Sequence, residues 1–220
     1  MEETILTPSQ RAVLESLAQD KYITDNFYLT GGTTLSEFYF KHRLSEDLDL
    51  FSEKDYDSKK VIIWVKKAAD DLKIQRLEQQ KLTGQEVFYL YFVKEKFVKV
   101  DFSYFPFSHL GEFKKYKDLK IASIEDIAVN KIQAILTRKQ SRDYLDLYLC
   151  SKYLKWTPKD MQKSYRLKFD TYLSYEQLAT SFTNIVDSSD LPKFLGNTPW
   201  SEVEKYFLSQ VANLKNKVIM

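Results

Sequence analysis

The stretch FYLTGGTTLSEFYFKHRLSEDLDLF, residues 27–51, combines a short apolar run, a double glycine and two alternating aspartates. The apolar residues 27–29 predict a strand. Gly31 and Gly32 predict a turn that tolerates positive φ or the close approach of a ligand. A helical stretch follows, and residues 47–51 then alternate polar and apolar side chains with the two-residue period of a half-buried strand. The sequence therefore predicts a strand, a glycine turn, a helix and a second strand.

The two aspartates of the second strand suggest a metal-held phosphate. Asp47 and Asp49 face the same side of that strand, about 7 Å apart along it. Mg²⁺ prefers hard oxygen ligands, and a phosphate chain suits the N–H groups at the start of a helix, where the hydroxyls of Thr33 and Thr34 can add donors. Two such ions would activate an attacking hydroxyl and stabilise a leaving pyrophosphate. Because two alternating aspartates are common on protein surfaces, this interpretation depends on the nearby glycine turn.

Residues 31–35 followed by residues 42–49 (HRLSEDLD) resemble the AbiEii family of nucleotidyltransferase toxins, which belongs to the polymerase-β-like nucleotidyltransferase superfamily. The family pattern is a double glycine, a helix and then R-x-S-x-D-x-D, and this chain matches each element. From this part of the chain we expect the nucleotide to be bound by Gly31, Gly32, Thr33, Thr34, Arg43 and Ser45.

A second block, residues 126–147, resembles the family signatures K-[LI]-x-A-x-x-x-R and R-D-x-x-D-L. Lys131 and Arg138 are seven residues apart, two turns along one face of the expected helix. The lysine suits a triphosphate as a point charge, and Arg138 or Arg142 could hold oxygens bidentately. The resemblance adds Asp143 and Asp146 to the expected nucleotide-binding residues. The alternative is that these arginines and aspartates tie two helices together by ion pairs.

Residues 97–103 predict another strand, with apolar side chains on one face and Lys99, Asp101 and Ser103 on the other. In the superfamily that the chain resembles, a carboxylate from a neighbouring strand completes the metal site, and the resemblance gives this role to Asp101. The expected metal ligands are therefore Asp47, Asp49 and Asp101. The expected catalytic residues are these three and Lys131.

Composition limits the class of protein. The chain has 220 residues, of which 44% are hydrophobic and 15% aromatic, and this excludes a disordered protein. Only 5 Gly and 5 Pro indicate long regular elements. No apolar run is long enough to cross a membrane, so we expect a cytoplasmic protein without membrane contact. The single cysteine, Cys150, excludes a disulfide within the chain.

The remaining patterns predict an α+β protein. We expect a nucleotidyltransferase domain with a mixed β-sheet and helices over residues 1–108, and an α-helical bundle over residues 109–220 that completes the active site. A capped helix is predicted from Thr7 to about residue 21. A hairpin is predicted across residues 93–96, a basic linker over residues 106–120, and a helix that opens at Ser123. Further helices are predicted near residues 158–169, 174–187 and 199–216.

Charge is uneven along the chain. Residues 1–60 hold 7 Lys/Arg against 12 Asp/Glu, a balance of −5, and residues 112–168 hold 14 against 7, a balance of +7. An acidic metal centre with a basic second half suits an enzyme that acts on a polyanion. The alternative is that the lysines only solvate helices.

The resemblance implies a toxin of a type IV toxin–antitoxin or abortive-infection system, which acts in phage defence. It further implies transfer of a nucleoside monophosphate from an NTP to an RNA acceptor, tRNA above all, with Mg²⁺ as cofactor. The implied protein partner is a DNA-binding antitoxin expressed from the same operon. Two alternatives stay open. One is the same transfer to a protein hydroxyl or a small molecule such as an antibiotic, and the other is a non-catalytic nucleotide- or RNA-binding protein on the same fold.

Overall fold

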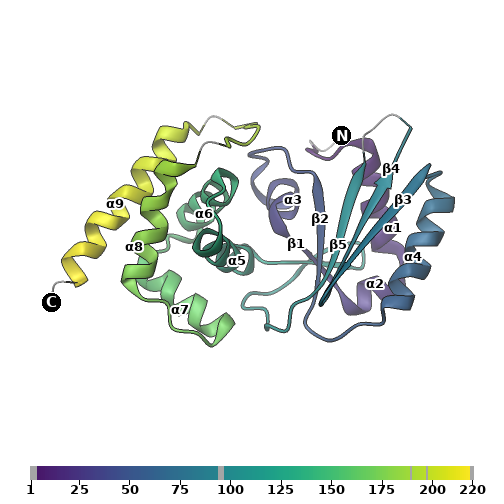
Figure 1. Cartoon of the computed structure of the whole chain (residues 1–220), viewed down its shortest axis with the longest axis horizontal. Helices are drawn as coiled ribbons and strands as arrows, with labels where there is room; N and C mark the ends of the chain where they lie inside the picture. Colours follow the sequence, from purple (N-terminus) through teal and green to yellow (C-terminus); the bar gives the residue numbers. More distant parts are fainter. Residues whose placement is uncertain (1–3, 94–96, 189, 197, 219–220) are drawn as a thin grey trace. The chain divides into compact units, whose positions relative to one another are not determined.

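The chain divides into two compact units (Figure 1). The structure is a computed structural model that describes residues 4–93, 97–188, 190–196 and 198–218. Unit 1 comprises Met1–Ser108 and Glu112–Ala122, and unit 2 comprises His109–Gly111 and Ser123–Met220. Unit 1 contains the sheet and unit 2 is helical. The fold is therefore mixed α and β, as the sequence predicts.

Seven strands of the described residues form one mixed sheet in the order β3-β4-β5-β2-β1-β7-β6. Two neighbouring pairs, β2 with β5 and β1 with β7, are parallel, and the other pairs are antiparallel. The strands are β1 Tyr28–Thr30, β2 Asp47–Ser52, β3 Arg76–Leu82, β4 Gln85–Tyr91, β5 Val98–Tyr104, β6 Lys114–Tyr116 and β7 Leu119–Ile121.

The helices of unit 1 begin and end at recognisable signals. Thr7 caps α1 through a reciprocal capping box with Gln10, as the sequence predicts. The expected single helix to residue 21 is two helices, because the Asp20 side chain accepts a hydrogen bond from the Ile23 amide and starts a new one. The helices are α1 Pro8–Gln19, α2 Lys21–Asn26, α3 Gly31–Leu35, the π-helix η1 Ser36–Phe40 and α4 Ser58–Asp71.

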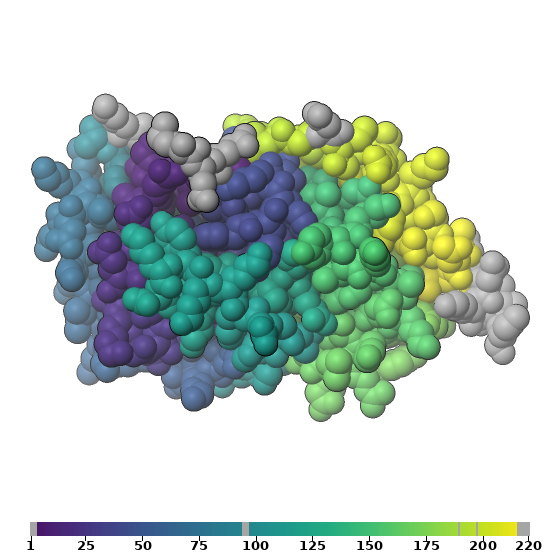
Figure 2. Space-filling view, turned by 180° about the vertical axis from the view of Figure 1, so that it is seen from behind, coloured from purple at the N-terminus to yellow at the C-terminus, as the bar shows by residue number. Residues whose placement is uncertain are grey.

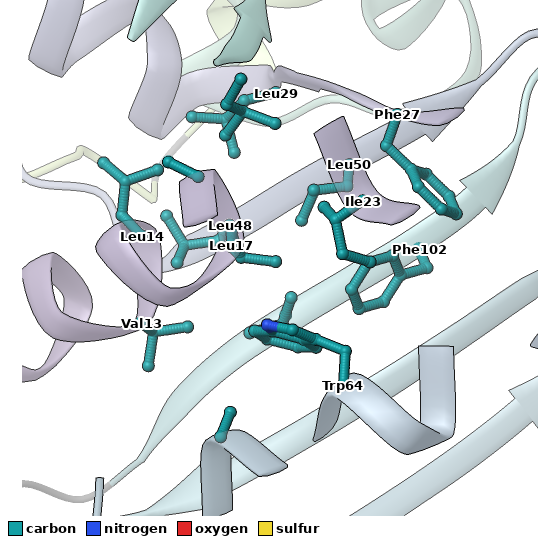
Figure 3. Packing of buried hydrophobic residues seen from close by; sticks show 14 of the residues in the cluster. Val13, Leu14, Leu17, Ile23, Phe27, Leu29, Leu48, Leu50, Trp64 and Phe102 are labelled. Carbon is teal, nitrogen blue, oxygen red and sulfur yellow. The ribbon is translucent and has the colours of Figure 1, made fainter. Parts of the chain in front are cut away.

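The hydrophobic core of unit 1 lies on one face of the sheet (Figure 3). Leu48 and Leu50 of β2 and Phe102 of β5 are fully buried there. They pack with residues of α1, such as Leu17, and with Trp64 of α4. Side chains alternate along a strand, so the residues between these apolar ones lie on the opposite face. The core therefore directs the aspartates of β2 away from α1 and α4.

Three strands differ from the sequence-based predictions. Residues 106–120 were expected to be a linker of the helical half, but β6 and β7 join the sheet of unit 1, where Leu119 and Ile121 are buried and β7 pairs with β1. The strand β3 was not predicted, because all seven of its side chains are exposed and it shows no apolar face. The expected hairpin turn falls partly on residues 94–96, which lie outside the described residues.

Unit 2 consists of helices around a core that includes Ile132, Tyr144, Phe182 and Phe207. Ser123 caps the first helix, as predicted. No helix in the described part of the chain is long and apolar enough to cross a membrane. The helices are α5 Ile124–Thr137, α6 Ser141–Leu154, α7 Pro158–Phe169, α8 Tyr175–Thr183, the 3₁₀ helix η2 Asn184–Asp187 and α9 Trp200–Val218.

Candidate active site

The three aspartates predicted as metal ligands lie on the polar face of two adjacent strands. Along β2, Asp47 and Asp49 are half-buried while the leucines between and after them are buried on the other face. The parallel pairing of β2 with β5 places Asp49 opposite Asp101 and Asp47 opposite Lys99. Residues 52 positions apart in sequence therefore meet across one pair of strands.

Lys99 contributes a cation to this acidic face. Its Nζ lies 3.2 Å from Asp47 Oδ2. Burial by itself lowers the pKa of Lys99, but the carboxylates of Asp47, Asp49 and Asp101 outweigh it, so the pKa is raised overall. The lysine was seen in the sequence only as a member of the polar face of its strand. Its contact with Asp47 depends on the strand register, which the sequence does not show.

Asp101 is the most buried of the three carboxylates, with 5% of its surface exposed. Gln85 Nε2 donates to its Oδ2 at 2.5 Å, and Ser103 Oγ donates to its Oδ1 at 2.7 Å. Burial raises the pKa of Asp101, and the two hydrogen bonds oppose that rise without cancelling it. Gln85 is a residue of this site that sequence reasoning missed, because it comes from the antiparallel neighbour β4.

The glycine turn packs directly against the motif that follows it. Gly31 has φ +81°, and a Cβ placed on it would lie 2.0 Å from Asp49 Oδ2. A Cβ on Gly32 would lie 2.0 Å from Arg43 Nη2 and 3.3 Å from Ser45 Oγ. A side chain at Gly31 would have to displace Asp49, and one at Gly32 would have to displace Arg43. The double glycine is therefore favoured by the close approach of these side chains and, at Gly31, by the backbone conformation as well.

Arg43, Thr33 and Thr34 are buried against other parts of the protein. Arg43 is 3% exposed and donates from Nη1 to the Leu44 carbonyl at 3.0 Å. The Thr34 hydroxyl donates to the Thr30 carbonyl at 2.5 Å, and the Thr33 hydroxyl is buried without a hydrogen-bond partner. In this structure these side chains support the turn, whereas Ser45 is half-buried and closer to solvent.

Gln10 holds the loop that leads into β2. Its Nε2 donates to the carbonyls of Ser45 and Glu46 at 2.9 and 3.0 Å, while its Oε1 accepts from the Thr7 amide at 3.0 Å. The capping pattern in the sequence shows the bond to Thr7 but not the bonds to the loop. Gln10 therefore joins the start of α1 to the residues just before Asp47.

The oxygen atoms of the three aspartates are chemically suited to bind a divalent cation. Asp47, Asp49 and Asp101 offer carboxylate oxygens on one face, which are the ligands that Mg²⁺ prefers. Within the described ranges, no three His, Cys, Asp or Glu side chains are already arranged to hold a metal ion. In this structure Lys99 contacts Asp47, while Gln85 and Ser103 donate hydrogen bonds to Asp101.

The second signature forms a buried ion-pair cluster in unit 2. Lys131 Nζ lies 2.6 Å from Asp143 Oδ1 and 2.7 Å from Asp146 Oδ2. Both carboxylates are fully buried and the lysine side chain is 9% exposed. Burial alone would raise the pKa of Asp143, but Lys131 and Arg138 lower it below its usual value. The cluster joins α5 to α6.

The arginines of this signature differ from each other. The expected common helix face of Lys131 and Arg138 is wrong, because α5 ends at Thr137 and Arg138 has an extended backbone. Arg138 still reaches Asp143, with Nε 2.7 Å from Oδ2. Arg142 is exposed and donates to Gln140 at 3.0 Å. The alternative drawn from the sequence paired these two arginines with Asp143 and Asp146. In the structure Arg138 pairs with Asp143, and both aspartates pair with Lys131.

A separate cavity of about 740 Å³ lies elsewhere in unit 1. The cavity is lined by residues of α1, η1 and β6, and Figure 2 shows these parts of the chain side by side, in purple, indigo and teal. Its charged residues are of both signs, and Glu37 is bound by the Thr4 hydroxyl, the Ile5 amide and Lys41. None of the residues predicted to bind nucleotide or metal lines this cavity.

The fold is shared with solved structures from Helicobacter pylori. JHP933 has 18% sequence identity and a TM-score of 0.62, covering 94% of this chain and 89% of that chain. A putative nucleotidyltransferase has 18% identity and a TM-score of 0.61, covering 96% and 97%. No curated protein matches the sequence. The chain therefore shares its overall fold with these two structures, one of which is described as a putative nucleotidyltransferase.

The family model described as "Nucleotidyl transferase AbiEii toxin, Type IV TA system" matches residues 12–194. The chain therefore belongs to the AbiEii family of nucleotidyltransferase toxins, and the resemblance found in its motifs is confirmed. Membership implies a transferase that uses an NTP and has an antitoxin partner.

Proposed function

We propose that this protein transfers a nucleoside monophosphate from an NTP to an RNA acceptor, tRNA above all, in a Mg²⁺-dependent reaction. The observation that carries the proposal is that Asp49 lies opposite Asp101 on one face of the sheet. Asp47 lies two residues before Asp49 on the same strand, and Asp49 also packs against the glycine turn. When bound there, Mg²⁺ would neutralise phosphate charge and activate a hydroxyl. Asp47, Asp49 and Asp101 would hold it.

The chain's own residues would orient the nucleotide around these carboxylates. The backbone of Gly31 and Gly32 permits the turn to lie against Asp49 and Arg43, which sets the position of Asp49. Ser45, held through its carbonyl by Gln10, is half-buried and is proposed to donate to a phosphate. Arg43, Thr33 and Thr34 are proposed to act by supporting the turn.

In unit 2, the proposal assigns phosphate binding to Lys131 with help from Arg138, and it rests on the match to the family signature. Asp143 and Asp146 would hold the lysine, as their ion pairs do in this structure. Arg142 is exposed and available to a phosphate oxygen. We further propose that the helical unit completes the active site of the nucleotidyltransferase unit.

The RNA acceptor is supported by the basic residues 112–168, whose balance is +7. Lys114 and Lys115 of β6 are exposed. Lys114 already contacts the Tyr39 ring, with its Nζ 4.2 Å from the ring centroid, and the nearby Lys117 Nζ lies 3.8 Å from a carboxylate oxygen of Glu15. The antitoxin is proposed to bind DNA and to come from the same operon, and the protein is proposed to act in the cytoplasm.

The test supplies each of the four labelled NTPs with total tRNA, total protein or an aminoglycoside as acceptor. We expect label on tRNA with Mg²⁺, none with EDTA, and none with Asp49→Asn. Acceptor affinity should fall with salt, with a log–log slope near −0.7 for each phosphate neutralised on single strands. Label on protein or on the antibiotic, with no label on RNA and no salt dependence, would overturn the RNA acceptor.

A further inference from the structure

Helix α7 of unit 2 (Figure 1) has a buried side and a basic side. Its sequence places Lys159, Lys163 and Arg166 at positions i, i+4 and i+7, which lie on one side of a helix. The successive rises along the axis are about 6 Å and about 4.5 Å. All three side chains are exposed. They form a short row of positive charges on a regular scaffold.

The other side of the helix is firmly held. Met161 is fully buried, and Lys168 makes a buried ion pair with Asp126 at 2.6 Å. Asp126 also accepts hydrogen bonds from the amides of Leu110 and Gly111 at 2.9 and 3.1 Å. The row of cations is therefore carried by a helix that cannot turn about its axis without breaking these contacts.

The basic side is hollowed rather than flat. A cavity of about 450 Å³ is lined by the three cations together with Gln162, Leu167, Asp170 and Tyr172. Leu167 is 65% exposed and Tyr172 is 70% exposed. Large exposed apolar groups beside positive charges are typical of a surface that binds a partner with both negative charge and flat apolar faces.

The turn that carries Tyr172 is fixed to the helix. Gln162 Nε2 donates to the Leu173 carbonyl at 2.7 Å, and the Asp170 amide donates to the Arg166 carbonyl at 2.9 Å. Asp170 itself adopts a left-handed conformation with φ 48°, which turns the chain back toward α7. Tyr172 therefore has a defined position beside the cations although its ring is exposed.

The positive charge of the cavity is only partly offset by the chain, because Lys159 and Lys163 interact electrostatically with Asp160. No ion pair is found for Lys159, Lys163 or Arg166 in the part of the chain that the structure describes, and Asp170 is the one acid among the lining residues. The nearby Asp160 carboxylate is engaged by the amide and hydroxyl of Thr157 at the helix start. A net positive cavity with an open aromatic ring complements a polyanion that carries bases.

We propose that Lys159, Lys163, Arg166 and Tyr172 form an RNA-binding surface, named here the α7 surface. The three cations neutralise successive phosphates of a single-stranded segment, and one base stacks on Tyr172. This inference rests on the proposed function, because the bound strand is the acceptor RNA. A row of cations matches a linear phosphate backbone, and the exposed ring gives RNA an interaction that an acidic peptide of equal charge lacks.

The test measures binding directly, by fluorescence anisotropy of a labelled unstructured RNA oligonucleotide and of labelled tRNA. The triple variant Lys159→Gln, Lys163→Gln, Arg166→Gln should bind RNA at least about tenfold more weakly and flatten the log–log salt slope by about two units, 0.7 for each lost cation. Tyr172→Ala should weaken binding about fivefold or more and leave the slope unchanged. Binding of NTP should be the same in all variants.

The matched control removes three exposed lysines from other parts of unit 2, Lys152→Gln, Lys193→Gln and Lys205→Gln, and should keep wild-type affinity. If the α7 triple variant binds RNA as this control does, the α7 surface is not an RNA site. A second result would also overturn the RNA assignment. If poly-glutamate displaces the labelled RNA as well as unlabelled RNA does, and Tyr172→Ala does not change RNA affinity, the surface binds any polyanion through charge alone.

Failure of the proposed function gives a different result. In that case the wild-type protein labels no RNA in the transfer assay, whatever the variants do. If the wild-type protein does label RNA and the triple variant binds and labels it equally well, the transfer reaction stands and the α7 surface alone is rejected.

Discussion

Lys99 Nζ lies 3.2 Å from Asp47 Oδ2, across two parallel strands whose register places the two residues opposite each other. The ammonium therefore sits among three carboxylates that would otherwise repel one another. A divalent cation at the same carboxylates must compete with a positive charge that the chain already provides. If the proposed metal site forms, Lys99 would link the stability of the metal-free protein to its affinity for metal.

Replacing Lys99 should separate these two effects. Lys99→Met should lower the free energy of unfolding by about 1 kcal/mol in EDTA, because the carboxylates lose their counter-charge. The same variant should bind Mn²⁺ several-fold more tightly by calorimetry, since the metal no longer displaces an ammonium. Lys66→Met, at an exposed position of α4, is the control and should change neither quantity. Weaker metal binding by Lys99→Met would reject this role.

Asp49 should be essential for transfer but not for folding. Asp49→Asn keeps the shape of the side chain on the polar face and opens no cavity, so the melting temperature should stay close to that of the wild type. Transfer should fall at least about 100-fold, as on loss of other preorganised charges at active sites. Glu46→Gln, an exposed neighbour, should keep full activity. Near-normal turnover by folded Asp49→Asn would show that this carboxylate is not part of the site.

Substitutions of Gly31 and Gly84 can separate the effect of backbone strain at positive φ from the effect of a steric clash with a neighbouring side chain. Both have positive φ, 81° and 73°, but a Cβ on Gly31 would meet Asp49 Oδ2 at 2.0 Å, whereas the nearest atom to a Cβ on Gly84 is 3.8 Å away. Gly84→Ala should cost about 1 kcal/mol of stability and keep activity. Gly31→Ala should cost more and lose transfer, because Asp49 must move. Equal activity in the two variants would contradict the contact.

Lys131 should be needed for the stability of unit 2. Lys131→Ala removes the cation that Asp143 and Asp146 share, leaving Asp143 paired with Arg138 alone, and should cost about 3 kcal/mol or more in urea unfolding. Lys139→Ala is the matched control, because its ion pair with Asp187 is half-exposed on both sides and should contribute less than about 1 kcal/mol. Transfer by Lys131→Ala must therefore be measured on folded protein. A variant as stable as the wild type would show that the cluster adds nothing to folding.

Acid should weaken unit 2 through Asp126. Burial alone would raise the pKa of Asp126, but Lys168 and the hydrogen bonds to it lower the pKa below its ordinary value. A lowered folded pKa gives stability that is present above about pH 4, the unfolded value, and is lost as the pH falls through the folded value. The difference in unfolding free energy between wild type and Asp126→Asn should therefore shrink from pH 5 to pH 3. Asp118→Asn, at an exposed acid of unit 1, is the control and should have nearly the wild-type unfolding free energy at pH 7.

The parts predicted well from the sequence are those that local periodicity determines. The alternation around Asp47 and Asp101 placed both on the polar faces of their strands, because Leu48, Leu50 and Phe102 have to be buried on the other face. The start of α5 at Ser123 followed from its cap. In each case a few neighbouring residues carry the information.

The parts that could not be predicted depend on residues far apart in sequence. Lys99 gains its partner only through the register of β2 and β5, and Gln85 reaches Asp101 from a third strand. The position of Arg138 was missed because a seven-residue spacing assumes that the helix continues, whereas α5 ends one residue earlier. Strand β3 has no buried side chain by which to recognise it.

The parallel pairing of β7 with β1 has a consequence for synthesis of the protein. Leu29 pairs with Ile121, so the strand that carries the chain into the glycine turn has no neighbour on that side until more than 90 further residues have been made. Pairing over such a separation is slow, because the intervening chain must first be brought together. Until residues 119–121 have emerged from the ribosome, β1 therefore has an open edge that other chains can join. Completion of unit 1 has to wait for Ile121 to emerge from the ribosome.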